Sequence, residues 1–254
     1  MGAAVNLYSA AFVARYSRGS DGHRAPLLEP GVCGVVPADE ERTIRLLAID
    51  DRAYDRFRTV VPTARQGIAN VFDTASRCDD FMRGQPDWTA ERPVAAMVCG
   101  DIQAVPAVTL PDELVLRAVR LTSEAPDAIP LEDAAAVAIA SDPGITGTAN
   151  EFAAHLRGLP TSVRLFAAVD ERGVVRATSG CDVFGDYARV FFVNTEPGWR
   201  RRGVGGAMTV EALRAAASAG ARQAFLDATD DGASVYMRLG FEVAGQLTRY
   251  SRAA

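Results

Sequence analysis

Residues 190–220 read VFFVNTEPGWRRRGVGGAMTVEALRAAASAG and join a β-rich run to a helix through a short turn. The turn places arginine at positions 200–202, directly before Gly203, and Gly205 and Gly206 follow. Phosphate groups commonly bind at a glycine-rich turn between a strand and a helix. This stretch therefore predicts a strand-turn-helix unit whose turn can bind a phosphate group.

The residues after the turn predict a helix with one polar stripe. Glu211, Arg214 and Ser218 lie at i, i+3 and i+7 among mostly apolar residues, and Gly220 is the expected C-terminal stop. Such a helix presents unpaired backbone N–H groups and the positive end of its dipole to the turn. Glycine lets an anion approach the backbone, and arginine adds charge-assisted hydrogen bonds. A solvated surface turn is the plain structural alternative.

A dinucleotide-binding turn is the main chemical alternative, because Asp227 follows the turn at about the distance of the ribose-binding acid in such folds. That fingerprint needs a third glycine, and Met208 stands in its place. Its glycine turn also usually follows the first strand of a domain, whereas several strands are expected before this one. The pattern therefore disfavours a dinucleotide-dependent oxidoreductase.

The turn resembles the pyrophosphate loop of the GNAT superfamily of N-acetyltransferases, whose pattern is Gln/Arg-x-x-Gly-x-Gly/Ala. Residues 200–205, RRRGVG, match it. Downstream, SVYMRLGFE resembles the Leu-Tyr-x-x-x-Gly-Phe element of the same superfamily, with Val235 at the leucine position before Tyr236, and then Gly240 and Phe241. The resemblance covers roughly residues 113–254.

The chain departs from the superfamily pattern just before the second motif. Thr229 stands where an asparagine is often found, and Gly232 stands where an alanine is often found. The contact that this asparagine makes near the pantetheine arm is therefore not expected here.

The resemblance implies acetyl-CoA as the acyl donor, with its pyrophosphate on backbone N–H groups of the turn. It also implies that the preceding strand splays from its neighbour and offers backbone groups to the pantetheine arm, one of which polarises the thioester carbonyl. Tyr236 is the candidate general acid for the departing thiolate, and a core aromatic is its structural alternative. The candidate cofactor-binding residues are Val193, Thr195, Arg200, Arg201, Arg202, Gly203, Val204, Gly205 and Gly206.

The expected acceptor is an amine, which must lose a proton before it attacks. The strand YARVFFVNT carries no carboxylate to take that proton. Four acidic residues stand nearby in the sequence, and a solvated surface charge is the plainer interpretation of each: Glu151, Asp182, Asp186 and Glu196.

The composition narrows the remaining possibilities. All 27 basic residues are arginine, so no lysine can form a Schiff base or a P-loop phosphate clamp. The net charge of −5 disfavours nucleic acid as a partner. The four cysteines lack the spacing of a metal site, so we expect buried free thiols and no metal. No apolar run reaches the ~20 residues of a membrane span, so we expect a cytoplasmic protein without a membrane partner; a homodimer is left open.

The order of patterns predicts an α/β fold with a GNAT-like mixed central sheet flanked by helices, preceded by a mainly helical N-terminal region. The helices of that region are expected within residues 38–57 and 64–82, a strand within 92–102, and a loosely ordered extension over 1–33. Pro106 and Pro111 mark a boundary between residues 1–112, of unknown role, and an acetyl-CoA-dependent N-acetyltransferase domain over 113–254. No internal repeat is visible.

The function predicted from the sequence is therefore transfer of an acetyl group from acetyl-CoA to an amine by direct attack. A non-catalytic acyl-CoA-binding sensor or interaction module of the same fold is the first alternative, and a dinucleotide-dependent oxidoreductase is the second.

Overall fold

The computed structural model describes residues 2–17, 24–37, 43–121, 128–142, 145 and 147–253. The chain forms two compact units. Unit 1 comprises Met1–Val98, Asp227–Ser234 and Glu242–Ala254, and unit 2 comprises Cys99–Leu226 and Val235–Phe241. The division of function between residues 1–112 and 113–254 stays a prediction.

Unit 1 contains a mixed sheet with the strand order β1-β2-β3-β4-β12-β6, and β5 pairs with β12. β3 and β4 are parallel, whereas β12 is antiparallel to both β4 and β6. The strands are β1 (Arg24–Glu29), β2 (Val32–Pro37), β3 (Thr43–Ala48), β4 (Gln66–Phe72), β5 (Thr89–Ala90), β6 (Val94–Cys99) and β12 (Glu242–Arg252). The helices are α1 (Ala3–Ser17), η1 (Asp51–Ala53), α2 (Tyr54–Val60), η2 (Val61–Thr63) and α3 (Ser76–Arg83).

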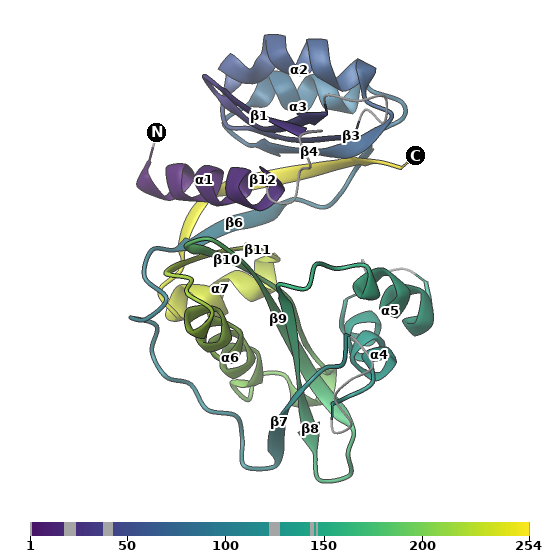
Figure 1. Ribbon diagram of the computed structural model, residues 1–254, viewed down its shortest axis with the longest axis vertical. Helices are drawn as coiled ribbons and strands as arrows, with labels where there is room; N and C mark the ends of the chain where they lie inside the picture. Colours follow the sequence, from purple (N-terminus) through teal and green to yellow (C-terminus); the bar gives the residue numbers. More distant parts are fainter. Residues whose placement is uncertain are drawn as a thin grey trace. The chain divides into compact units, whose positions relative to one another are not determined.

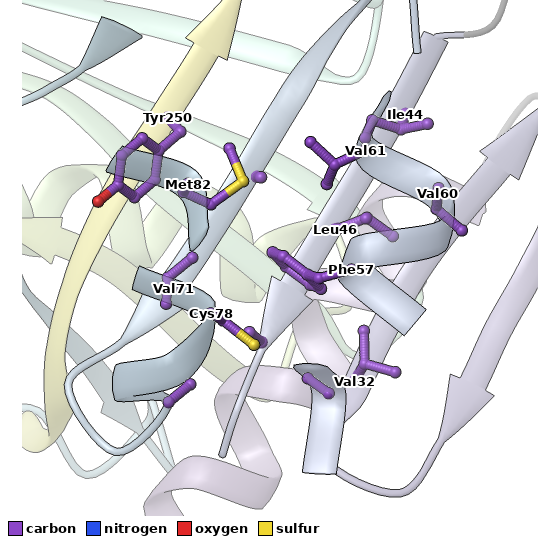
Figure 2. Packing of buried hydrophobic residues seen from close by; sticks show 14 of the residues in the cluster. Val32, Ile44, Leu46, Phe57, Val60, Val61, Val71, Cys78, Met82 and Tyr250 are labelled. Atoms are coloured by element: carbon purple, nitrogen blue, oxygen red, sulfur yellow. The ribbon is translucent and has the colours of Figure 1, made fainter. Parts of the chain in front are cut away.

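The core of unit 1 lies between the sheet and helices α2 and α3, which cover one face of it (Figure 1). In Figure 2 Phe57 of α2 lies beside Leu46 of β3, and Cys78 of α3 lies near Val71 of β4. Tyr250 of β12 belongs to the same buried cluster. The last strand of the chain therefore completes the core of the first unit.

The prediction of a mainly helical N-terminal region is wrong, because this region contains strands as well as helices. Residues 43–48 and 66–72, expected in helices, form the parallel strands β3 and β4. Most of the side chains in both strands are buried. A strand buried on both faces has a continuous apolar run, which periodicity alone does not distinguish from a helix. The expected extension over residues 1–33 instead contains α1, β1 and the start of β2.

Unit 2 contains a mixed sheet with the order β11-β10-β9-β8-β7. Only β10 and β11 are parallel among these neighbours. The strands are β7 (Leu114–Ala118), β8 (Val163–Asp170), β9 (Val175–Phe184), β10 (Tyr187–Thr195) and β11 (Gln223–Ala228). The helices are α4 (Leu131–Ser141), α5 (Ala149–Arg157), η3 (Pro197–Trp199), α6 (Val204–Ser218) and α7 (Asp230–Arg238).

Helices cover both faces of the sheet in unit 2. α4 and α5 cover one face over a core that includes Leu165 and Val175, and α6 covers the other through Val204 and Met208 (Figure 1). β11 and α7 begin in one unit and end in the other. The mixed central sheet flanked by helices is confirmed.

The same order of elements occurs twice along the chain, although the sequence shows no repeat. Three antiparallel strands, a helix, a strand parallel to the third, and a further helix appear as β1-β2-β3-α2-β4-α3 and as β8-β9-β10-α6-β11-α7. The two segments therefore share a backbone topology but not an amino-acid sequence.

Two further expectations concern buried thiols and membrane spans. Cys33, Cys78, Cys99 and Cys181 are buried free thiols, as predicted. Across the described ranges, no helix has the length and apolar character needed to cross a membrane.

Candidate functional site

The arginine-glycine turn forms the entrance to α6. Gly203 caps this helix in the left-handed conformation, with φ of 79°, and Arg201 is also left-handed, with φ of 62°. Within the described part of the chain, no group accepts a hydrogen bond from the backbone N–H of any residue from 201 to 206. These N–H groups and the helix dipole together form a site suited to an anion.

The three arginines of the turn have different surroundings. The Arg200 side chain donates to the carbonyl oxygens of Thr195, at 3.1 Å, and Ser141, at 2.8 Å. Arg202 donates to Glu113 at 2.6 Å. Its guanidinium also lies 4.3 Å from the centre of the Trp199 ring. These contacts hold the turn to β10, to the end of α4 and to the segment before β7.

All three arginines of the turn are exposed, but Arg201 differs from the other two because the described residues offer its side chain no hydrogen bond or ion pair. Its guanidinium is therefore available to a ligand. The roles of Arg200 and Arg202 as cofactor ligands stay predictions, because both side chains have structural contacts.

β10 separates from its parallel neighbour before it reaches the turn. Its register with β11 covers three pairs and ends at Arg189 opposite Phe225, although β10 continues to Thr195. The register with β9 shifts between Phe191 and Asn194, where two residues of β10 stand opposite one of β9. The splay and the bulge together leave one edge of β10 without a strand partner.

Val193 and Thr195 direct their main-chain groups toward that free edge. The N–H of Glu196, which immediately follows β10, donates to the carbonyl of Arg176 on the β9 side, at 2.9 Å. Main-chain groups alternate in direction along a strand, so those of Thr195 and Val193 point away from β9. The Thr195 carbonyl accepts from Arg200, whereas Val193 has no partner in β11.

The two sequence motifs lie beside each other in unit 2. A Cβ atom on Gly206 would lie 3.7 Å from the Val235 side chain, next to Tyr236. A Cβ atom on Gly205 would lie 3.6 Å from the Thr195 hydroxyl oxygen. The structure thus brings together the end of β10, the turn and the second half of α7.

Tyr236 is half-buried, and its ring contacts Phe241 edge-on, with centroids 6.0 Å apart. Burial raises the pKa of its phenol to about 12. The described residues include no acceptor for its hydroxyl group. Tyr236 therefore stays protonated at neutral pH and keeps a free proton to donate.

Three of the four carboxylates considered from the sequence have structural partners. Glu151 accepts from Thr148 in the capping box of α5, and the Thr148 backbone N–H holds its pKa below the usual range. Glu196 pairs with Arg176 at 2.5 Å. Asp182 is 3% exposed and accepts from the Ser162 hydroxyl at 2.7 Å. The fourth residue, Asp186, is exposed in the turn between β9 and β10. Its main-chain carbonyl oxygen accepts hydrogen bonds from two backbone N–H groups.

Sequence reasoning missed the residues that shape the bulge. Phe192 has a left-handed backbone, with φ of 59°. The buried hydroxyl of Thr178 and the side chain of Asn194 form hydrogen bonds at the same place. Asparagine is uncommon inside a strand, so Asn194 was the one residue in the sequence that could have indicated an irregularity in β10.

Comparison with known proteins agrees with this geometry at the level of the fold. No family model matches the sequence, and no curated protein matches it. Among solved structures, a GCN5-related N-acetyltransferase from Kribbella flavida is 18% identical with a TM-score of 0.62, and the match covers 100% of this chain and 97% of that one. A GCN5-related N-acetyltransferase from Sphaerobacter thermophilus is 17% identical with a TM-score of 0.55, over 99% and 93%.

A third similar structure, a tandem GNAT protein from the clavulanic acid biosynthesis pathway, is 15% identical with a TM-score of 0.53, over 98% of this chain and 94% of that one. The fold of this chain is thus that of GNAT N-acetyltransferases, as the two motifs predicted. The motifs indicated this resemblance for residues 113–254 alone, whereas the likeness in fold extends over the whole chain.

Proposed function

We propose that the protein transfers an acetyl group from acetyl-CoA to an amine. The observation that carries the proposal is the row of unpaired backbone N–H groups from Arg201 to Gly206, placed where β10 splays from β11. The fold supports the same proposal. Every residue that we assign to the donor lies within residues 113–254, the predicted acetyltransferase domain.

The donor residues divide into two groups. The backbone N–H groups of the turn and the Arg201 side chain would hold the pyrophosphate, and long-range attraction from the arginines would favour an anionic ligand. Val193 and Thr195 would contact the pantetheine arm at the free edge of β10. Bound acetyl-CoA supplies an activated thioester, and the Val193 N–H would donate to its carbonyl oxygen as negative charge develops there.

Tyr236 would donate its proton to the sulfur atom as the thiolate departs. The amine must arrive neutral or lose its proton to a base, and the partners of Glu151, Asp182 and Glu196 argue against these three carboxylates in that role. We expect an acceptor from one of three classes: a small-molecule amine, a peptide N-terminus or a protein lysine.

Two other functions use parts of the same geometry. A non-catalytic acyl-CoA sensor would need the turn but not the Tyr236 proton. A dinucleotide-dependent oxidoreductase normally uses a strand within a parallel sheet, whereas β10 is antiparallel to β9 and only partly paired with β11. The topology therefore favours the sensor as the stronger rival.

Calorimetric titration with acetyl-CoA tests the donor site, and Gly205→Val is the decisive variant. A Cβ atom at Gly205 meets only ordinary van der Waals contact, so we expect the helix to tolerate valine there. The methyl groups of valine would crowd the approach of a phosphate to the backbone N–H groups. We expect affinity to fall roughly tenfold to a hundredfold, the effect of losing one or two hydrogen bonds to a charged group. Gly203 is a poorer choice, because its positive φ strains any substitution there.

Gly198→Val is the matched control, because a Cβ at Gly198 meets no atom within 4 Å and this glycine lies just before the turn. Unchanged affinity in the Gly205 variant would refute the phosphate site. Release of free thiol from acetyl-CoA with a panel of amines then separates transferase from sensor. Titration with NADH tests the oxidoreductase.

A further inference from the structure

The bulge in β10 depends on a residue with an unusual backbone. Phe192 has φ of 59°, a conformation that bulky side chains rarely adopt. Phe192 and Val193 together stand opposite Ser179, between the pairs Phe191 with Gly180 and Asn194 with Thr178. A left-handed residue in this position needs contacts that hold it there.

Two polar side chains supply those contacts. The Thr178 hydroxyl donates to the Phe192 carbonyl oxygen at 2.8 Å. The Asn194 side-chain amide donates to the Thr178 hydroxyl oxygen at 3.3 Å. Thr178 is 0% exposed. The chain of bonds from Asn194 through Thr178 to Phe192 therefore connects both ends of the bulge to the middle of β9.

The bulge decides which main-chain groups face the free edge of β10. Without the extra residue, the register of β10 on β9 would shift by one, and Val193 would stand opposite Thr178. That position faces β9, as the alternation from the Glu196 to Arg176 hydrogen bond shows. Val193 would then turn its N–H away from the edge where β10 splays from β11.

We infer that Thr178, supported by Asn194, is a positioning residue that locks the bulge and thereby directs the Val193 N–H toward the acyl carbonyl of the donor. This inference rests on the proposed function. It concerns the carbonyl end of the donor and not the pyrophosphate, which binds at the turn.

Two ligands distinguish binding of the acyl carbonyl from binding of the pyrophosphate. Acetyl-CoA carries the thioester carbonyl, and S-ethyl-CoA is a thioether of similar shape without it. Wild-type protein should bind acetyl-CoA more tightly, by roughly threefold to tenfold, the typical effect of one net hydrogen bond. In Thr178→Val this preference should disappear, while the affinity for S-ethyl-CoA stays within about twofold of wild type.

Thr178→Ser is the matched control, because it keeps the hydroxyl group and should restore the preference for acetyl-CoA. Asn194→Ala is a second test with a milder effect on folding, because Asn194 is half-buried; it should reduce the preference in the same direction. A purely structural role for Thr178 would lower the affinities for both ligands equally and would overturn the inference.

Each of the other possible outcomes overturns a specific part of the argument. A wild-type preference that persists in Thr178→Val and Asn194→Ala overturns the lock and leaves the proposed function intact. Wild-type binding of both ligands without preference overturns the assignment of the Val193 N–H to the carbonyl. Failure of wild-type protein to bind either ligand overturns the proposed function and the lock together.

Discussion

Tyr236 combines a free hydroxyl group with a pKa raised by burial to about 12. An ordinary thiol has a pKa of about 8.5, so full proton transfer from this phenol to a thiolate in water would be unfavourable. Desolvation disfavours the charged form of a thiol, so a thiolate released beside the half-buried Tyr236 would be a stronger base than in water, and proton transfer from Tyr236 would become less unfavourable.

We predict that Tyr236→Phe lowers turnover by roughly 10² to 10⁴, the usual contribution of one proton-transfer group, and leaves the affinity for acetyl-CoA unchanged. Because burial raises its pKa to about 12, Tyr236 stays protonated through pH 10, where an ordinary tyrosine is half ionised. Wild-type turnover should accordingly show no alkaline decline from tyrosine ionisation below about pH 11.

Tyr187→Phe is the control for this experiment, because Tyr187 is also half-buried in unit 2 and lies at the far end of β10. Thiol release followed across the pH range measures both effects. Equal turnover in wild type and Tyr236→Phe would show that Tyr236 serves only for packing.

Single residues differ in how well the sequence predicts their place. The glycines of the turn belong to a motif with fixed spacing, so residues 200–206 were placed correctly between a strand and a helix. Phe192 and Thr178 were not, because a left-handed residue and a buried hydroxyl depend on contacts between β9 and β10, which sequence spacing does not contain.

The two segments of shared topology, β1 to α3 and β8 to α7, differ in how their parallel strands pair. β3 and β4 pair at six positions from Thr43 opposite Gln66 to Ala48 opposite Val71, without a shift in register. β10 and β11 pair at three positions and then separate. Among the described strands of the two segments, the third strand thus has an unpaired edge beside its parallel neighbour only in the second segment.

The turns that follow these strands also differ in charge. After β3, Asp50 accepts from the Arg52 N–H at 3.0 Å and caps η1, and Asp51 accepts from the Arg77 N–H at 2.8 Å. Carboxylates thus occupy N–H groups at the starts of η1 and α3 in the first segment. They would repel a phosphate, whereas the turn before α6 presents unpaired N–H groups and Arg201.

We therefore predict that the chain binds one acetyl-CoA and not two, although the order of elements is repeated. Calorimetry should give a stoichiometry of about one per chain, and native mass spectrometry should show a single bound ligand. The Gly205→Val variant should remove that one binding event. A second binding event that survives in this variant would place a donor site in the first segment and contradict the prediction.

At this scale the sequence predicted a helix with clear ends better than strands buried on both faces. α6 begins after the glycine turn and ends shortly before Gly220, as expected. β3 and β4 carry no such signals, and their apolar runs fit a helix as well as a strand. The repeat was missed for a different reason, because the two segments share their topology but not the motif residues.

At the scale of the whole molecule, unit 1 includes residues from both sides of the predicted boundary at position 112. The proposed donor residues all lie beyond that position, but β12 belongs to unit 1. There it pairs with β4, β5 and β6, all of which precede residue 112. Leu247 and Tyr250 of β12 are each 1% exposed, and the Tyr250 hydroxyl donates to Asp79 at 2.6 Å.

We predict that a fragment over residues 110–254 does not fold as an independent domain, because its last strand loses every strand that pairs with it. Exposed edges and the uncovered side chains of Leu247 and Tyr250 should make the fragment aggregate. Size-exclusion chromatography and thermal unfolding followed by circular dichroism measure this. Co-expression of residues 1–109 should restore soluble protein, since that piece carries β4, β5 and β6. A monodisperse fragment that unfolds cooperatively by itself would contradict the prediction and support a separable domain over residues 113–254.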